Sequence, residues 1–338
     1  MRYLLYTLSI VLVGFNAFSQ QEAHFVILPN NPYILNPAAG GMSDIIQIES
    51  TSRFQWLGYN GGPRSIMLTA NSPMKMGTSV KAVDEFNVTD EKFFKTPKIT
   101  TGKTKHVVGG KFINDAIGPF SRTSIYGTYA VHIPLSSSMN LGAGLGAGFT
   151  NFSINESRVV LYEENDFTYS SFLGNSASQG ILDANAGLMV YSKHFYAGLS
   201  MSQALNNNVI FDNTSTMSNY NRHLFLMAKY TADINDDFAI EPTVIGKFVK
   251  NSPMAFDIGA RAVINQASWF GLQYRTSNAI LAQVGSNLIK NLYIAYAYEH
   301  SIGKISLAGN STHEIQLGLY LGNNRNLKKE IKEKKVEH

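Results

Sequence analysis

The feature that most constrains this chain is a repeated alternation of apolar residues with polar residues or glycine, running from Asp44 to Leu321. About fourteen segments of roughly nine to twelve residues follow this pattern, and longer connections alternate with shorter ones. Such a segment is too short to cross a bilayer as a helix and long enough to cross it as a tilted strand. Because every backbone N–H and C=O group in lipid must be paired, strands span a membrane only in a closed barrel. The sequence therefore predicts an all-β fold, a transmembrane antiparallel outer-membrane β-barrel of about fourteen strands.

The start of the chain has the composition of an export signal. Arg2 supplies a positive charge, residues 4–15 are mostly apolar, and residues 17–19 form a small-x-small cleavage site. We therefore predict a signal peptide over residues 1–19. A membrane anchor is the alternative, but the apolar stretch is short for one. The chain contains no cysteine, which excludes disulfides and thiolate metal ligands.

Charged residues are sparse and unevenly placed. They make up 15% of the chain, below the roughly one quarter that is usual in soluble proteins. The formal net charge of +4 is carried by Arg2 and by the tail from Asn323, which has six basic and three acidic residues. A nucleic-acid-binding protein needs a basic stripe on its body, so we expect no nucleic-acid partner.

The sequence contains no motif that predicts chemistry. No pair of histidines has metal-ligand spacing, and no glycine-rich loop lies between a strand and a helix. We therefore expect no catalytic residue, no cofactor and no metal. A Ser/His/Asp set assembled across several strands is the alternative, since it would form no motif in the sequence.

Four charged residues fall on the polar faces of predicted strands. Glu49 and Arg53 share the polar face of the segment 44–56, and Asp257 and Arg261 share that of a later segment. Such charges are costly in a dry core, whereas a watery or plugged barrel lumen accommodates them. We treat the four residues as candidates for the lumen or for partner binding.

Glycine occupies every second position of one predicted strand. The glycines on this face are Gly142, Gly144, Gly146 and Gly148. Because glycine weakens a strand, such a run needs a reason. One explanation is close approach of another backbone, such as a plug or a bound segment in the lumen, and the other is tight curvature of the wall.

The connections predict an orientation in the membrane. With a periplasmic N-terminus and C-terminus, the longer connections lie outside the cell and the shorter ones are periplasmic turns. The connection 74–105 is periplasmic in this scheme but is long and charged, as in a docking segment or a family-variable insertion. We further predict an N-terminal segment 20–43 at or in the barrel mouth, a barrel over 44–322, and a charged periplasmic tail over 323–338.

Four short motifs stand in order along this pattern. Their residues are His24, Phe25, Asn36 and Pro37, then Arg53, Gln55 and Trp56, then Asn114, Asp115, Gly118 and Pro119, and finally His313 and Glu314. In physical terms the third motif is a set of turn formers, and each Asn before a proline is held extended. Together the motifs resemble those of the PorP/SprF-like outer-membrane proteins of type IX secretion in Bacteroidota, over nearly all of the chain after the signal peptide.

The resemblance implies a non-enzymatic barrel that works in type IX secretion or in the linked gliding machinery. It implies three kinds of partner, namely outer-membrane lipid, a secreted adhesin-like cargo bound through its C-terminal domain, and periplasmic secretion-system or peptidoglycan-binding proteins. This hypothesis predicts a lumen occupied by the N-terminal segment or by a partner. The alternative is an outer-membrane diffusion channel, which predicts an open pore with Glu49, Arg53, Asp257 and Arg261 near its constriction.

Overall fold

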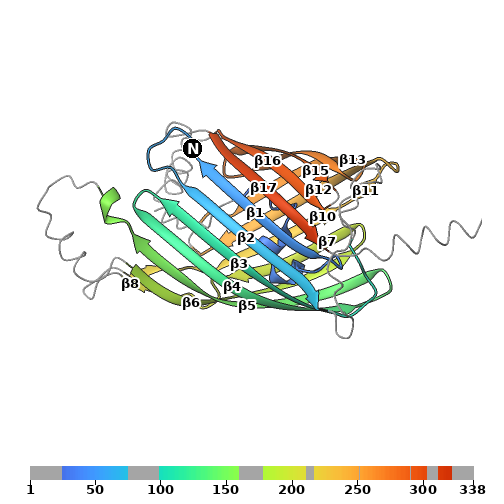
Figure 1. Ribbon diagram of the computed structural model, residues 1–338, viewed down its shortest axis with the longest axis horizontal. Coiled ribbons are helices and arrows are strands. Elements are labelled where there is room, and N and C mark those ends of the chain that lie inside the picture. The colour runs from blue at the N-terminus through green and yellow to red at the C-terminus, as the bar shows by residue number, and fades with distance from the viewer. Residues whose placement is uncertain are drawn as a thin grey trace, which may run out of the picture.

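The computed structural model describes residues 25–74, 99–159, 178–210, 217–250, 252–289, 291–302 and 311–321. Fourteen of its strands form one closed antiparallel barrel, which confirms the predicted fold class (Figure 1). The predicted signal peptide, most of the connection 74–105 and the tail 323–338 lie outside the described residues. Within the described residues, no helix has the length and apolar character needed to cross a membrane.

Each barrel strand pairs with the next barrel strand along the chain, and β17 closes the barrel on β1. The barrel strands are β1 (Ile46–Gln55), β2 (Arg64–Met74), β3 (Lys105–Ile117), β4 (Phe120–Pro134), β5 (Met139–Ile154), β6 (Ser178–Ser192), β7 (Phe195–Ser202), β10 (His223–Tyr230), β12 (Phe238–Val249), β13 (Ala255–Ile264), β14 (Ser268–Arg275), β15 (Ala279–Ile289), β16 (Leu292–Ser301) and β17 (Ser311–Leu321). The remaining elements are the short strands β8 (Asn208–Ile210), β9 (Met217–Asn219) and β11 (Ala232–Asp233), and the 3-10 turns η1 (Pro32–Ile34), η2 (Pro37–Ala39) and η3 (Glu156–Arg158).

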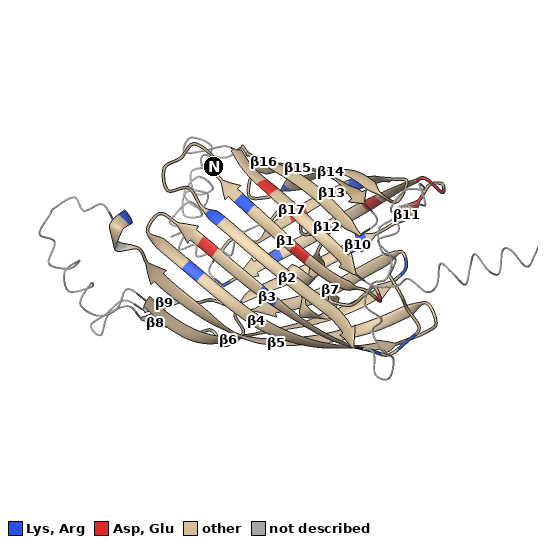
Figure 2. Cartoon of the chain, viewed as in Figure 1, with Lys and Arg blue, Asp and Glu red and all other residues tan. Residues whose placement is uncertain are grey.

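Alternation along each strand separates an outer apolar surface from the lumen. On β4, Ile125, Tyr129 and Ile133 are exposed on the outside, whereas Tyr126 and Thr128 point inward and are buried. Charged residues are few along the strands that face the viewer in Figure 2. An outward band of apolar and aromatic side chains is the surface that an outer-membrane barrel presents to lipid.

The two ends of the barrel carry different connections. One end has the connections 155–177 and 203–222, and we call it the long-loop end. The other has the turns 135–138 and 193–194, and we call it the short-turn end. The long charged connection 75–104 joins β2 to β3 at the short-turn end and is the exception to this asymmetry.

The turn predicted from the third motif is shorter than expected. β3 continues through Ile117, and both Asn114 and Asp115 pair with β2 and β4 within it. Only Gly118 and Pro119 connect the two strands, and Gly118 has the positive φ of 54° that a two-residue hairpin turn favours. The turn-forming tendency of Asn and Asp is overridden here because neighbouring strands on both sides offer ladder hydrogen bonds.

Residues 25–45 lie inside the barrel, and we call this segment the plug (Figure 1). Its two 3-10 turns each begin with a proline that follows an asparagine. Proline suits this first position because its φ is already set for a helical turn. Asn36 is extended, with φ −125° and ψ 111°, and its side chain accepts a hydrogen bond from the N–H of Ala38.

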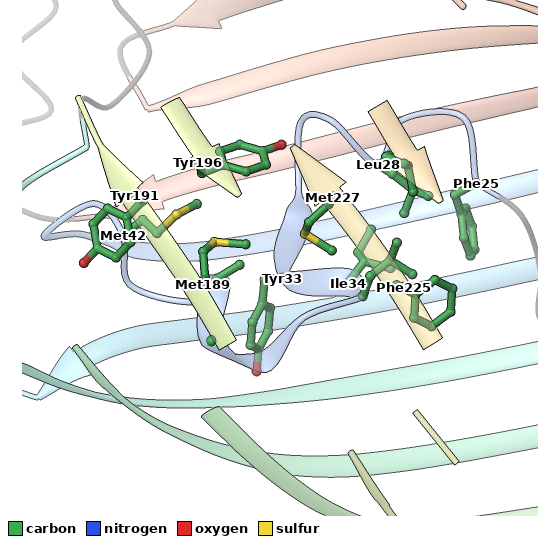
Figure 3. Close-up of a cluster of buried hydrophobic side chains, with 14 of the residues drawn as sticks. Phe25, Leu28, Tyr33, Ile34, Met42, Met189, Tyr191, Tyr196, Phe225 and Met227 are labelled. Atoms are coloured by element: carbon green, nitrogen blue, oxygen red, sulfur yellow. The ribbon is translucent and has the colours of Figure 1, made fainter. Parts of the chain in front are cut away.

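The apolar core of the molecule lies between the plug and the lumen wall. In one cluster Phe25 and Ile34 of the plug pack with Phe225 of β10 (Figure 3). In a second cluster Val26 and Ile27 belong with aromatic and small residues of β14, β15 and β16. Apolar burial therefore holds the plug against two different parts of the wall.

Candidate functional site: the plug and the lumen wall

The start of the plug is bound by a buried carboxylate. Glu314 of β17 accepts a hydrogen bond from the N–H of Val26 at 2.8 Å and one from the N–H of Ile27 at 3.2 Å. The same carboxylate is ion-paired with Arg53 of β1, and both side chains are at most 2% exposed. An ionised acceptor makes stronger hydrogen bonds than a neutral one, so this contact is a firm attachment of plug to wall.

Glu314 belongs to a ladder of six charges that alternate in sign around the lumen near the long-loop end. Its members, in the order of their contacts, are Lys247 of β12, Asp257 of β13, Arg275 of β14, Glu299 of β16, Arg53 of β1 and Glu314 of β17. Within it, Arg275 and Glu299 lie 2.7 Å apart, and Arg53 and Glu299 lie 3.1 Å apart. Three cations and three anions cancel, which is the arrangement that makes buried charges tolerable.

A second charged cluster holds the plug at a different place. Arg261 of β13 pairs with Glu241 of β12 and donates to the side-chain oxygen of Asn30 in the plug. Glu241 also pairs with Lys229 of β10 at 3.2 Å. Asp257 and Arg261, which lie on one face of one strand, thus belong to two separate clusters.

The end of the plug is bound by a buried cation. Lys105, the first residue of β3, donates from its ammonium group to the carbonyl oxygens of Gly41 at 3.2 Å and Met42 at 3.0 Å. It also pairs with Asp44 at 3.4 Å. N–H groups at the start of the plug therefore donate to the carboxylate of Glu314, and C=O groups near its end accept from the ammonium group of Lys105. Between these two contacts the plug runs lengthwise through the lumen.

Neutral side chains attach the middle of the plug. Asn31 donates to the hydroxyl of Thr69 at 2.9 Å, and the hydroxyls of Tyr33 and Thr128 lie 2.5 Å apart. These contacts reach β2 and β4, which lie far around the barrel from the Arg261 cluster on β10, β12 and β13. The plug is consequently bound to opposite sides of the wall.

Two of the four glycines in the predicted run lie against the plug. A Cβ atom on Gly144 would lie 2.5 Å from the amide nitrogen of Ala38, and one on Gly142 would lie 3.0 Å from its carbonyl oxygen. Gly146 and Gly148 instead face side chains and backbone of the neighbouring strands. The close approach of plug backbone therefore accounts for Gly142 and Gly144 only.

Asn36 bridges two strands of the wall. Its side-chain nitrogen donates to the carbonyl of Leu188 on β6 at 3.0 Å and to that of Leu199 on β7 at 3.3 Å. Gly187 and Gly198 leave the space for this amide, since a Cβ atom on Gly187 would lie 2.0 Å from its oxygen. Asn36, a residue of the first motif that sequence analysis selected, is thus a plug anchor.

The structure brings only some of the other candidate residues to the plug. Phe25 packs in the apolar core, Pro37 opens η2, and Arg53 and Glu314 form the pair described above. Glu49 is buried in the wall of β1, and it makes no ion pair within the part of the chain that the structure describes. His24 lies outside the described residues.

The remaining motif residues lie away from the plug. Gln55 is the last residue of β1, and Trp56, expected within that strand, follows its end with a positive φ of 55°. His313 lies on the outer surface, where its ring nitrogen is 2.6 Å from the hydroxyl of Tyr296. Sequence reasoning also missed Lys105, because nothing distinguishes it from the other lysines of its charged surroundings.

These features define an outer-membrane β-barrel whose lumen is filled by its own N-terminal segment. Residues 17–319 match the family model described as type IX secretion system membrane protein PorP/SprF. Because the match covers most of the chain, this protein belongs to the PorP/SprF family. A search of curated proteins finds no match.

Three solved structures are weakly similar to this chain. Omp33 of Acinetobacter baumannii is 8% identical, with 82% of this chain and 99% of that chain covered and a TM-score of 0.44. A FadL homologue of Pseudomonas aeruginosa is 9% identical, with 85% and 92% covered and a TM-score of 0.45. The toluene transporter TbuX of Ralstonia pickettii is 10% identical, with 85% and 90% covered and a TM-score of 0.42. At these values the likeness carries no argument about what this chain does.

Proposed function

We propose that this protein is a non-enzymatic component of type IX secretion or of the linked gliding machinery, and that it binds a secreted surface protein through that protein's C-terminal domain. The observation that carries the proposal is the plug, which fills the lumen and is held at both ends by buried charges. A barrel closed in this way is suited to be a fixed platform for other proteins. It is poorly suited to diffusion of solutes.

The charges of the lumen support the same proposal. A diffusion channel uses luminal charges to line a water-filled path, whereas Arg53, Asp257 and Arg261 are each paired with an opposite charge here. Two of these clusters also bind the plug directly. Of the four charges that the channel alternative placed at a constriction, Arg261 thus binds the plug directly and Arg53 pairs with the carboxylate that binds it.

The two ends of the barrel suit different partners. Loop asymmetry favours the long-loop end as the outer face. A secreted protein would contact the barrel through its C-terminal domain at this end. The charged connection 75–104 leaves the short-turn end, where periplasmic secretion-system or peptidoglycan-binding proteins are within reach. An N-terminal signal peptide over 1–19 completes the proposal, since it directs export of the chain out of the cytoplasm.

The proposal is tested by light cross-linking of intact cells, gentle solubilisation of the outer membrane and mass spectrometry of the proteins recovered with this barrel. We expect a secreted surface protein that is linked through its C-terminal domain to the long-loop end. Recovery of periplasmic proteins alone, linked to 75–104 or to the tail, would replace cargo binding with an anchoring role. Recovery of no protein, together with steady conductance of the purified barrel in a bilayer, would favour the diffusion channel.

A further inference from the structure

The described end of the connection 75–104 contacts the end of the plug, and we call residues 99–104 the strap. The N–H group of Thr100 donates to the carbonyl oxygen of Met42 at 3.0 Å, and the hydroxyl of Thr100 donates to the same oxygen at 3.3 Å. Lys105, which binds the end of the plug, also donates to the carbonyl oxygen of Thr100 at 2.9 Å. The strap therefore takes part in holding the end of the plug.

The rest of the strap is attached to the wall at the short-turn end. The side chain of Asn140 on β5 accepts a hydrogen bond from the N–H of Gly102 at 2.8 Å and donates one to the carbonyl oxygen of Lys103 at 2.9 Å. Asn140 itself is fully buried. The hydroxyl of Thr101 also donates to the carbonyl oxygen of Ser137, in the turn between β4 and β5, at 3.1 Å. The strap thus bridges the plug and the wall.

The two ends of the plug differ in how far their attachments are exposed to water. At the long-loop end, the side chains of Arg53 and Glu314 are at most 2% exposed. At the short-turn end, residues 102–104 of the strap are exposed. Backbone hydrogen bonds close to solvent open more readily than those in a buried region. The end of the plug is therefore expected to leave the wall before its start does.

We propose that the strap is a latch on the plug. While the strap is seated on Asn140, the carbonyl oxygen of Met42 keeps its donors from Thr100 and the short-turn end of the lumen stays closed. When the strap is lifted, the end of the plug loses these donors and separates from the wall more often, whereas the start of the plug stays on Glu314. The inference rests on the proposed function in one respect, namely that a periplasmic partner at the short-turn end is the protein that lifts the strap.

Thiol accessibility tests the latch in the purified protein in detergent micelles. The chain has no cysteine, so Met42→Cys reports on the end of the plug and Val26→Cys reports on its start. Both positions are buried, and both residues bind the wall or the strap through backbone atoms that the substitution leaves in place. The rate of reaction with a water-soluble maleimide then measures how often each end of the plug opens.

Two variants lift the strap in different ways. Asn140→Ala removes both of its contacts with the strap backbone. Gly102→Val acts at an exposed site, where the positive φ of 75° and a Cβ position 2.8 Å from the carbonyl oxygen of Ser137 exclude a side chain. In either variant we expect Met42→Cys to react about tenfold faster, which corresponds to about 1.4 kcal/mol, and Val26→Cys to react at an unchanged rate.

Asn151→Ala is the matched control, because it removes an asparagine from the outer face of the same strand and should change neither rate. An unchanged rate at Met42→Cys in the Gly102→Val variant would overturn the latch, even if Asn140→Ala failed to fold. An equal increase at both cysteines would also overturn it, since the whole plug would then be loosened. These rates are measured without any partner, so they leave the proposed function to be tested separately by cross-linking in cells.

Discussion

Deletion of residues 25–43 is expected to convert a closed barrel into an open channel. Barrels of about eight strands are filled by their own side chains, whereas those of about 16–18 strands leave an aqueous channel. A barrel of fourteen strands falls between these sizes, and its interior is occupied here by the plug. In planar bilayers we expect no steady conductance from the full chain and a steady, ohmic conductance from the deletion variant.

The deletion variant retains the means to fold. Glu314 loses its hydrogen bonds to the plug but keeps Arg53, and the six charges of the ladder still cancel. Removal of the tail 323–338 is the matched control and should leave the barrel closed. A full-length barrel that conducts as well as the deletion variant would contradict the plugged lumen.

Replacement of Glu314 by leucine is expected to have the second large effect. Among the described residues, Arg53 would be left with Glu299 as its one ion-pair partner, and the N–H groups of Val26 and Ile27 would lose their acceptor. Removing one partner of a buried ion pair costs about 3–5 kcal/mol. We expect the free energy of unfolding in lipid or detergent to fall by an amount of that order, and we expect the variant barrel to open intermittently in bilayers.

Two further variants test whether the carboxylate of Glu314 is the cause of the lower stability and the intermittent opening. Glu314→Gln keeps an acceptor for the plug but removes the charge, so its effect should be smaller. The outward neighbour His313 is the control, since His313→Gln changes the same strand without touching the plug. If Glu314→Leu were as stable and as tightly closed as the original chain, the carboxylate would not be the attachment that we describe.

The barrel could be predicted from sequence because its determinants are local. A period of two fixes which residues face lipid and which face the lumen, and connection lengths fix which strands are neighbours. Short turns were predicted to alternate with longer connections, and the connection from β4 to β5 is such a turn of residues 135–138. The motif Asn114–Pro119 was the exception, because turn-forming residues were outweighed there by pairing with β2 and β4.

The candidate site was predicted less completely because it depends on contacts across the lumen. Periodicity places Arg53 and Glu314 inside, but it does not show that Glu314 reaches the amide of Val26 nearly three hundred positions earlier in the chain. For the same reason Asp257 and Arg261 looked alike in sequence and joined different clusters. Lys105 was missed because its role depends on plug carbonyl groups, which leave no mark on the sequence.

The most direct test of the account is a disulfide between the plug and the wall. The chain has no cysteine, so Gly40→Cys and Asn71→Cys introduce a single pair, and a Cβ atom on Gly40 would lie 3.4 Å from that of Asn71. Disulfides place their Cβ atoms about 3.5–4.5 Å apart, and the bond should form during export because the periplasm is oxidising. Gly40→Cys with Ala70→Cys, whose side chain lies on the outer face of β2, is the matched control. We predict that only the first pair resists alkylation until it is reduced, whereas free thiols in the first pair, or equal bonding in both pairs, would contradict a plug held in the lumen.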